Sequence, residues 1–180
     1  MRRVAPAPEA LIEHLRAADE PRLTLLTGGR GSSKTRWCCA TREAALHAGF
    51  EVAGVLSPPV YGAGGKIAID VMDAKSGERR RLAVRPSAHQ TGTAGLGWRF
   101  DPEALAWGDD LLYRAPPCDL LFVDELGPLE FRGAGGFRHG FAAIEARRYH
   151  LAVVVIRPEL LDAALARWPW VAAIYDKELR

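Results

Sequence analysis

The sequence predicts an α/β protein in which a mostly parallel sheet is covered by helices on both faces. Short apolar segments of strand length alternate along the chain with longer segments whose apolar residues recur at helical spacing. The segments at 120–123 and 151–156 are continuously apolar, as in strands that are buried on both faces of a parallel sheet. Since crossovers between parallel strands are usually helical, this order favours a parallel sheet. The length of 180 residues predicts one domain, 1–180.

The expected elements follow one another in a simple order. The first helix has Leu11, Ile12 and Leu15 on one face, and another helix begins at Asp101, which with Pro102 and Glu103 forms a favourable N-terminal sequence. The remaining strands are expected at 23–26, 52–56, 120–123, 151–156 and 171–175, and the remaining helices at 34–48, 137–144 and 160–168.

An antiparallel hairpin is expected as an insertion at about residues 66–84. Ile67, Ile69 and Val71 alternate with less apolar residues, which predicts a half-exposed strand with these three side chains on one face. A turn signal at 75–77 precedes a second strand at 79–84. Residues 91–98 are rich in glycine and are expected to form a loop.

Composition restricts the possible partners. The formal net charge is only +2, so no global attraction to nucleic acid or to an anionic membrane is expected. No apolar run reaches the length of a membrane span, and the N-terminus lacks the apolar core of a signal peptide. Cys38, Cys39 and Cys118 have no spacing typical of a zinc site or a disulfide framework. We therefore expect a cytoplasmic protein, and the sequence leaves its protein partners open.

The strongest motif is a glycine-rich loop between the strand at 23–26 and the helix at 34–48. This context is the one in which a phosphate-binding loop (P-loop) is expected. Backbone N–H groups of such a loop point at the phosphates, Lys34 supplies a positive charge to the β- and γ-phosphates, and the Thr35 hydroxyl ligates magnesium. The predicted nucleotide-binding residues are Gly28, Gly29, Arg30, Gly31, Ser32, Ser33, Lys34 and Thr35.

One position departs from the usual motif. Ser33 occupies the place of the second glycine in the pattern G-x-x-x-x-G-K-[ST]. We expect its Cβ to crowd the loop and to weaken nucleotide binding.

Two adjacent carboxylates follow the predicted strand at 120–123. Ligands collect at the carboxyl ends of strands in open α/β sheets. Asp124 is therefore assigned to the magnesium site, and Glu125 is assigned as the general base that polarises the attacking water. Arg157, at the carboxyl end of the strand at 151–156, is a candidate arginine finger for the γ-phosphate, against the alternative of a solvated surface side chain.

Several segments resemble a known family, the small P-loop nucleoside-triphosphatases of the cancer-related nucleoside triphosphatase type. The segments are TGGRGSSKT, GVLSPPV, GKIAIDVMDAKSGERRRLA, WRFDPEAL and LLFVDELGPLEF, and the resemblance runs from about Leu23 to Ile156. It implies a RecA-like core and slow, broad hydrolysis of nucleoside triphosphates. It also implies that Gly28, Gly31, Lys34 and Thr35 contact phosphate and magnesium, with Asp124 and Glu125 in the roles given above. The family motif usually has glycine at the position of Ser33.

The sequence therefore favours a magnesium-dependent nucleoside triphosphatase that uses ATP or GTP. Two alternatives remain open. A kinase would use the same loop to transfer the γ-phosphoryl group to a small molecule, and a nucleotide-gated binding module would change its loops when the γ-phosphate leaves. For Arg79, Arg80 and Arg81, contact with nucleic acid is weighed against a charged hairpin edge, and the edge is preferred.

Overall fold

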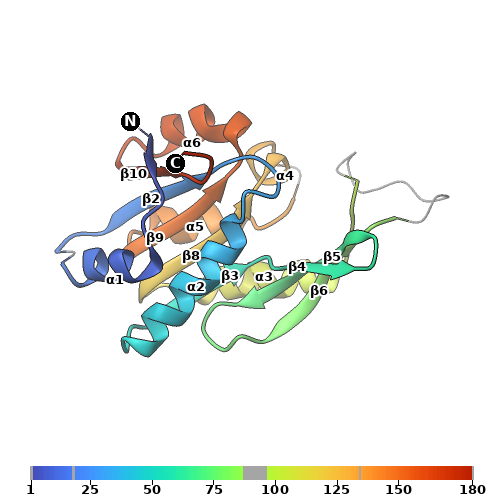
Figure 1. The fold of residues 1–180 in the computed structure, drawn as a ribbon, viewed down its shortest axis with the longest axis horizontal. Coiled ribbons are helices and arrows are strands. Elements are labelled where there is room, and N and C mark those ends of the chain that lie inside the picture. Colours follow the sequence, from blue (N-terminus) through green and yellow to red (C-terminus); the bar gives the residue numbers. More distant parts are fainter. Residues whose placement is uncertain (1, 18, 87–96, 134, 180) are drawn as a thin grey trace.

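The computed structural model describes residues 2–17, 19–86, 97–133 and 135–179 (Figure 1). Within these residues, ten strands form one sheet. The strands are β1 (Arg2–Val4), β2 (Arg22–Thr27), β3 (Val52–Leu56), β4 (Pro59–Gly62), β5 (Gly65–Asp73), β6 (Arg79–Val84), β7 (Arg99–Phe100), β8 (Cys118–Leu126), β9 (Tyr149–Ile156) and β10 (Val171–Asp176). The helices are α1 (Pro8–Arg16), α2 (Lys34–His47), α3 (Pro102–Arg114), α4 (Pro128–Phe131), α5 (His139–Glu145) and α6 (Leu161–Arg167), with a 3₁₀ turn, η2, at Pro158–Leu160.

The larger part of the sheet is parallel. Its strand order is β1-β10-β2-β9-β8-β3, and every neighbouring pair in this part runs in the same direction. The remainder is antiparallel: β5 pairs with β3, β6 with β5 and β7 with β6, while β4 pairs with β5 off the main path. The predicted α/β class with a mostly parallel sheet is confirmed.

Helices cover both faces of the parallel strands, as the sequence predicts. Successive strand residues point to opposite faces, so each central strand contributes to two cores. Leu25 and Val123 pack in the core that α3, α5 and α6 cover. Leu26 and Phe122 pack in the core that α1 and α2 cover. In Figure 1, α1 and α2 lie in front of the sheet and α3 and α5 behind it.

The predicted hairpin exists as β5 and β6, but its details differ from the expectation. It continues the main sheet, because β5 pairs directly with β3, and β4 and β7 widen it. The expected apolar face is wrong at its start, since Ile67 is 46% exposed whereas Ala68 is 1% exposed. The β5–β6 pairing shifts register between Ile69 and Asp70, and a shift of one residue exchanges the two faces of a strand.

The start of α3 agrees with the sequence analysis. The Asp101 side chain accepts a hydrogen bond from the Ala104 N–H at 2.8 Å, and Pro102 opens the helix. The predicted loop at 91–98 falls mostly outside the described residues. Among the residues that are described, no helix is both long and apolar enough to cross a membrane.

Candidate functional site

The predicted site residues gather at one edge of the sheet because their strands are parallel. The strands β2, β9, β8 and β3 end at this edge, and β9 lies between β2 and β8. The glycine-rich loop follows β2, Arg157 follows β9, and Asp124 and Glu125 lie near the end of β8. Residues separated by more than a hundred positions in the sequence are thereby brought to one edge.

The glycine-rich loop turns sharply into α2. Gly28 and Gly31 have φ angles of 137° and 81°, in the region where a side chain is strained. The first turn of α2 has no acidic residue and no side-chain cap. Its N–H groups and the positive end of the helix dipole are therefore free to bind an anion.

Lys34 lies folded over this loop. Its ammonium donates hydrogen bonds to the carbonyl oxygens of Gly28 and Gly29 at 2.6 and 2.8 Å and to the Ser32 hydroxyl at 3.3 Å. The positive charge is thus held at the centre of the loop, next to the uncapped N–H groups of α2.

Ser33 has a backbone conformation that favours glycine. Its φ and ψ angles are 63° and 28°, the left-handed region, and it occupies the N-cap position of α2 without forming a side-chain cap. A side chain in this conformation costs about 1–2 kcal/mol. The serine therefore strains its own backbone. Crowding of a nucleotide by its Cβ stays a prediction.

Asp124 is almost completely buried and is surrounded by hydrogen-bond donors. It is 2% exposed. Its Oδ2 accepts a hydrogen bond from the Ser57 N–H at 3.1 Å, and the Thr35 hydroxyl also donates to its carboxylate. Burial raises the pKa of Asp124 to about 6, with the Glu125 charge adding to the rise and the hydrogen bonds opposing it. A buried carboxylate beside a threonine hydroxyl is a set of hard oxygen donors that suits magnesium.

Glu125 and Arg157 form an ion pair at this edge. The guanidinium Nε donates to Glu125 Oε1, and the two side chains are 29% and 27% exposed. Asp124 and Glu125 thus face different partners, the first Ser57 and Thr35 and the second Arg157. Solvent still reaches both members of the ion pair.

Glu130 secures the loop that follows β8. Its carboxylate accepts hydrogen bonds from the N–H groups of Gly127 at 2.7 Å and Phe137 at 2.9 Å. The chain from Gly127 to Phe137 is thereby closed on itself beside the end of β8. Glu130 is engaged in holding this loop.

Three residues near the site were missed by the sequence analysis. Ser57, directly after β3, touches Asp124 through its N–H and its hydroxyl. Lys66, at the start of β5, lies within electrostatic reach of Glu125 and Asp124. Lys177, after β10, donates its N–H to the Thr27 carbonyl at 3.0 Å, beside the glycine-rich loop. Only Ser57 had a usable signal, because it directly follows a predicted strand.

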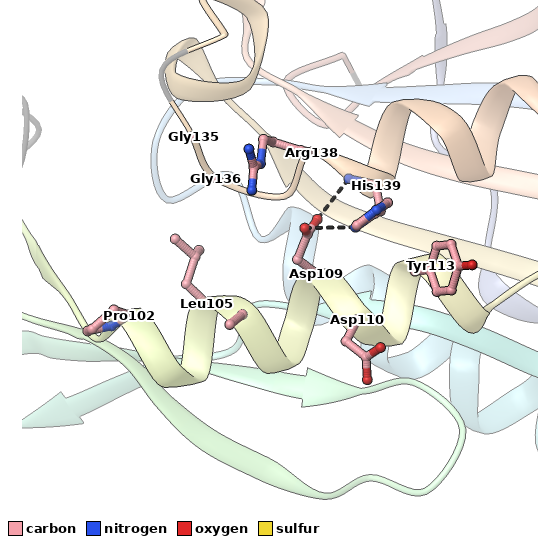
Figure 2. A pocket seen from close by; sticks show the side chains of 10 residues that line it. Pro102, Leu105, Asp109, Asp110, Tyr113, Gly135, Gly136, Arg138 and His139 are labelled. Atoms are coloured by element: carbon pink, nitrogen blue, oxygen red, sulfur yellow. Dashed lines mark hydrogen bonds and ion pairs between the residues drawn. The ribbon is translucent and has the colours of Figure 1, made fainter.

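A cavity of about 430 Å³ lies between α3 and the segment that leads into α5 (Figure 2). Asp109 holds His139 there, accepting hydrogen bonds from its backbone N–H at 2.7 Å and from its ring Nδ1 at 2.8 Å. None of the predicted site residues lines this cavity. Asp109 and His139 tie α3 to α5, and the candidate site is at the sheet edge instead.

Known proteins resemble this chain over most of its length. The NTPase family matches residues 23–168. The chain is 26% identical over 158 residues to the nucleoside-triphosphatase THEP1 of Methanopyrus kandleri, covering 82% of this chain and 86% of the relative. It is 30% identical over 110 residues to the THEP1 of Methanothermobacter thermautotrophicus, covering 60% and 62% of the two chains.

Solved structures show the same fold. The solution structure of a human cancer-related nucleoside triphosphatase matches with a TM-score of 0.60 at 18% identity, over 86% of this chain and 88% of the other. The crystal structure of THEP1 from Aquifex aeolicus matches with a TM-score of 0.56 at 10% identity, over 86% and 87%. The RecA-like fold expected from the resemblance is confirmed. The family match spans most of the chain, and the chain therefore belongs to the NTPase family and is a nucleoside-triphosphatase.

Proposed function

We propose that this protein hydrolyses nucleoside triphosphates, ATP or GTP, to diphosphate and phosphate in a magnesium-dependent, slow reaction with broad base preference. The observation that carries the proposal is the meeting of a glycine-rich loop before an uncapped helix, a buried carboxylate and an ion-paired glutamate at one sheet edge. Breadth and slowness rest on the resemblance to the family.

The loop from Gly28 to Thr35 binds the triphosphate. Its uncapped N–H groups donate hydrogen bonds to the phosphate oxygens. Lys34 turns from the carbonyl oxygens of Gly28 and Gly29 toward the β- and γ-phosphates, exchanging neutral acceptors for charged ones.

Thr35 and Asp124 are the residues that hold magnesium. They are already in hydrogen-bond contact and belong to α2 and β8, so the two residues would hold the ion from the helix and from the acidic strand. Magnesium bound there would supply positive charge to the β- and γ-phosphate oxygens.

Glu125 takes the proton of the attacking water, and Arg157 stabilises the charge on the γ-phosphate. Because β9 lies between β2 and β8, Arg157 rises between the phosphate loop and Glu125. In the structure the two side chains neutralise each other. An incoming triphosphate competes with Glu125 for the guanidinium, which frees the carboxylate to orient water.

The strain at Ser33 bears on folding more than on binding. The left-handed backbone is present without nucleotide, so its free-energy cost falls on the folded state whether or not the loop is occupied. On this account the serine lowers stability, whereas crowding of the nucleotide by its Cβ would lower affinity instead.

Glu125→Gln should lower the single-turnover rate of hydrolysis by about a hundred- to ten-thousandfold without weakening Mg–ATP binding, because glutamine keeps the shape, cannot accept the proton and has no charge to compete for Arg157. Rapid-quench kinetics and calorimetry measure the two quantities. Glu145→Gln is the matched control, since it breaks another glutamate–arginine pair, Glu145 with Arg167 at 2.7 Å. If Glu125→Gln hydrolyses at the wild-type single-turnover rate, another group orients the attacking water.

Asp124→Asn should stabilise the protein above pH 6 in the absence of magnesium and nucleotide. The folded-state pKa of Asp124, about 6, lies above its usual 3.8, so the folded state binds this proton more tightly than the unfolded state. The protonated carboxyl contributes its full stability below pH 3.8. This contribution is lost as the pH rises through 6, and the total loss in the free energy of unfolding is about 3 kcal/mol.

Urea unfolding of both proteins across pH 4 to 8 measures this effect. The free energy of unfolding of Asp124→Asn minus that of wild type should grow with pH, whereas the exposed-site control Asp110→Asn should show no such growth. A difference that is flat with pH contradicts the assignment of a raised pKa to Asp124.

Ser33→Gly should raise the free energy of unfolding by about 0.5–1 kcal/mol. This value is the left-handed strain that glycine relieves minus the larger backbone entropy that glycine loses on folding. Mg–ATP affinity should change by less than about threefold, since 0.6 kcal/mol corresponds to that factor. Denaturant unfolding and calorimetry measure both values. A tenfold gain in affinity with unchanged stability would show instead that the Ser33 Cβ crowds the nucleotide.

A further inference from the structure

The first half of β5 extends past the sheet edge that carries the site. The pairing of β5 with β3 stops at Leu56, opposite Met72, while β5 itself begins at Gly65. The residues before Met72 therefore run beyond the carboxyl end of β3, where β4 and β6 support them. Lys66 is the second residue of this overhanging segment.

Lys66 is a half-buried cation near the two carboxylates. In the described part of the chain no carboxylate lies within salt-bridge distance of its ammonium. It nevertheless interacts electrostatically with Glu125, Asp124, Arg157 and Arg30. Burial lowers the pKa of Lys66, and Arg157 and Arg30 lower it further, against the opposing effect of the two carboxylates.

The ring of Trp98 holds Lys66 in place. The ammonium lies 5.1 Å from the centre of the Trp98 ring, and the guanidinium of Arg85 lies 5.9 Å from the same centre. Lys66 in β5 and Arg85, which directly follows β6, are close, since the Arg85 N–H donates to the Ile67 carbonyl at 3.2 Å. A cation held on an aromatic face keeps its charge while its hydrogen-bond donors stay available.

The surroundings of Lys66 are rich in positive charge. Arg30 and Arg157 act electrostatically on Lys66 together with the carboxylates of Asp124 and Glu125, and the Arg85 guanidinium lies near the same Trp98 ring. Keeping a half-buried ammonium beside other cations is unfavourable in the free protein. A bound polyphosphate anion offsets the repulsion between these cations, and the cluster of positive charge is therefore suited to binding one.

The order of the strands indicates that Lys66 lies nearest the γ-phosphate end of the nucleotide. Along the edge, the phosphate loop follows β2, the two carboxylates belong to β8, and β5 lies beyond β3 on the far side of β8. The γ-phosphate must lie toward the carboxylates if they act on it. Lys66 therefore approaches the γ-phosphate from the side opposite the loop.

On the basis of the function proposed above, we propose that Lys66 binds the γ-phosphate oxygens and makes the site select triphosphates over diphosphates. Lys34 contacts the β- and γ-phosphates from the loop, and Lys66 contacts only the γ-phosphate from the hairpin. Loss of phosphate after hydrolysis removes the ligand of Lys66 and weakens the hold on the product.

The test compares Lys66→Met with wild type in calorimetric titrations with Mg–ADP and with a non-hydrolysable Mg–ATP analogue. A charged hydrogen bond confined to the γ-phosphate predicts about a 10- to 100-fold loss of analogue affinity and unchanged ADP affinity. Lys66→Arg should retain most of the preference for the analogue. Lys75→Met, in the exposed turn at the other end of β5, is the matched control and should bind both nucleotides as wild type does.

The outcomes separate this inference from the proposed function. Equal losses for ADP and the analogue, or no loss for either, overturn the assignment of Lys66 to the γ-phosphate while leaving hydrolysis by the wild type intact. Absence of nucleotide binding by the wild type overturns the proposed function and this inference with it. Thermal unfolding of each variant verifies folding, and Lys66→Gln supplies a second substitution if the methionine variant does not fold.

Discussion

The parallel pairing of β2, β9 and β8 is the constraint on which the site depends. Because these strands run in the same direction, the loop after β2, the turn after β9 and the carboxylates of β8 meet at one edge. The intervening β9 also sets the spacing of the strands, since it separates β2 from β8 and is followed by Arg157, which pairs with Glu125. An antiparallel β9 would send Arg157 to the opposite edge and remove the partner of Glu125.

Two features of the edge lower stability and are tolerated by the surrounding structure. Ser33 holds a left-handed backbone, and Asp124 holds a carboxylate that is 2% exposed. Both lie where α2 meets β8, between well-packed cores on the two faces of the sheet. Strained backbone and buried charge of this kind concentrate at functional sites. The two apolar cores supply stability that offsets the strain at Ser33 and the burial of the Asp124 carboxylate.

Local sequence predicted the parallel half of the fold well. Apolar strands followed by glycine, proline or charged residues marked β2, β3, β8, β9 and β10, and the expected class and hairpin are present. The short strands β1, β4 and β7 carry too few residues for a pattern to be visible. The burial of Ala68 in place of Ile67 depends on a register shift, which is a property of the pairing and leaves no mark in either strand alone.

The site itself was only partly predictable. The motif around Lys34 and the Asp124–Glu125 pair follow from strand ends, but the pairing of Glu125 with Arg157 needs the strand order. Lys66 could not be found from sequence, because it is one cation among the 24 lysines and arginines, and only the overhang of β5 brings it near the carboxylates. Positions fixed by tertiary pairing are those at which sequence patterns carry no information.

The most direct test of the account is a calorimetric titration of Mg–ATP into wild type and Lys34→Ala, with phosphate release measured on the same samples. The account predicts that wild type binds and releases phosphate, whereas Lys34→Ala loses about a hundredfold or more in affinity because the phosphates lose their charged donor in the loop. Equal affinity and equal phosphate release in the two proteins would contradict nucleotide binding by the loop after β2.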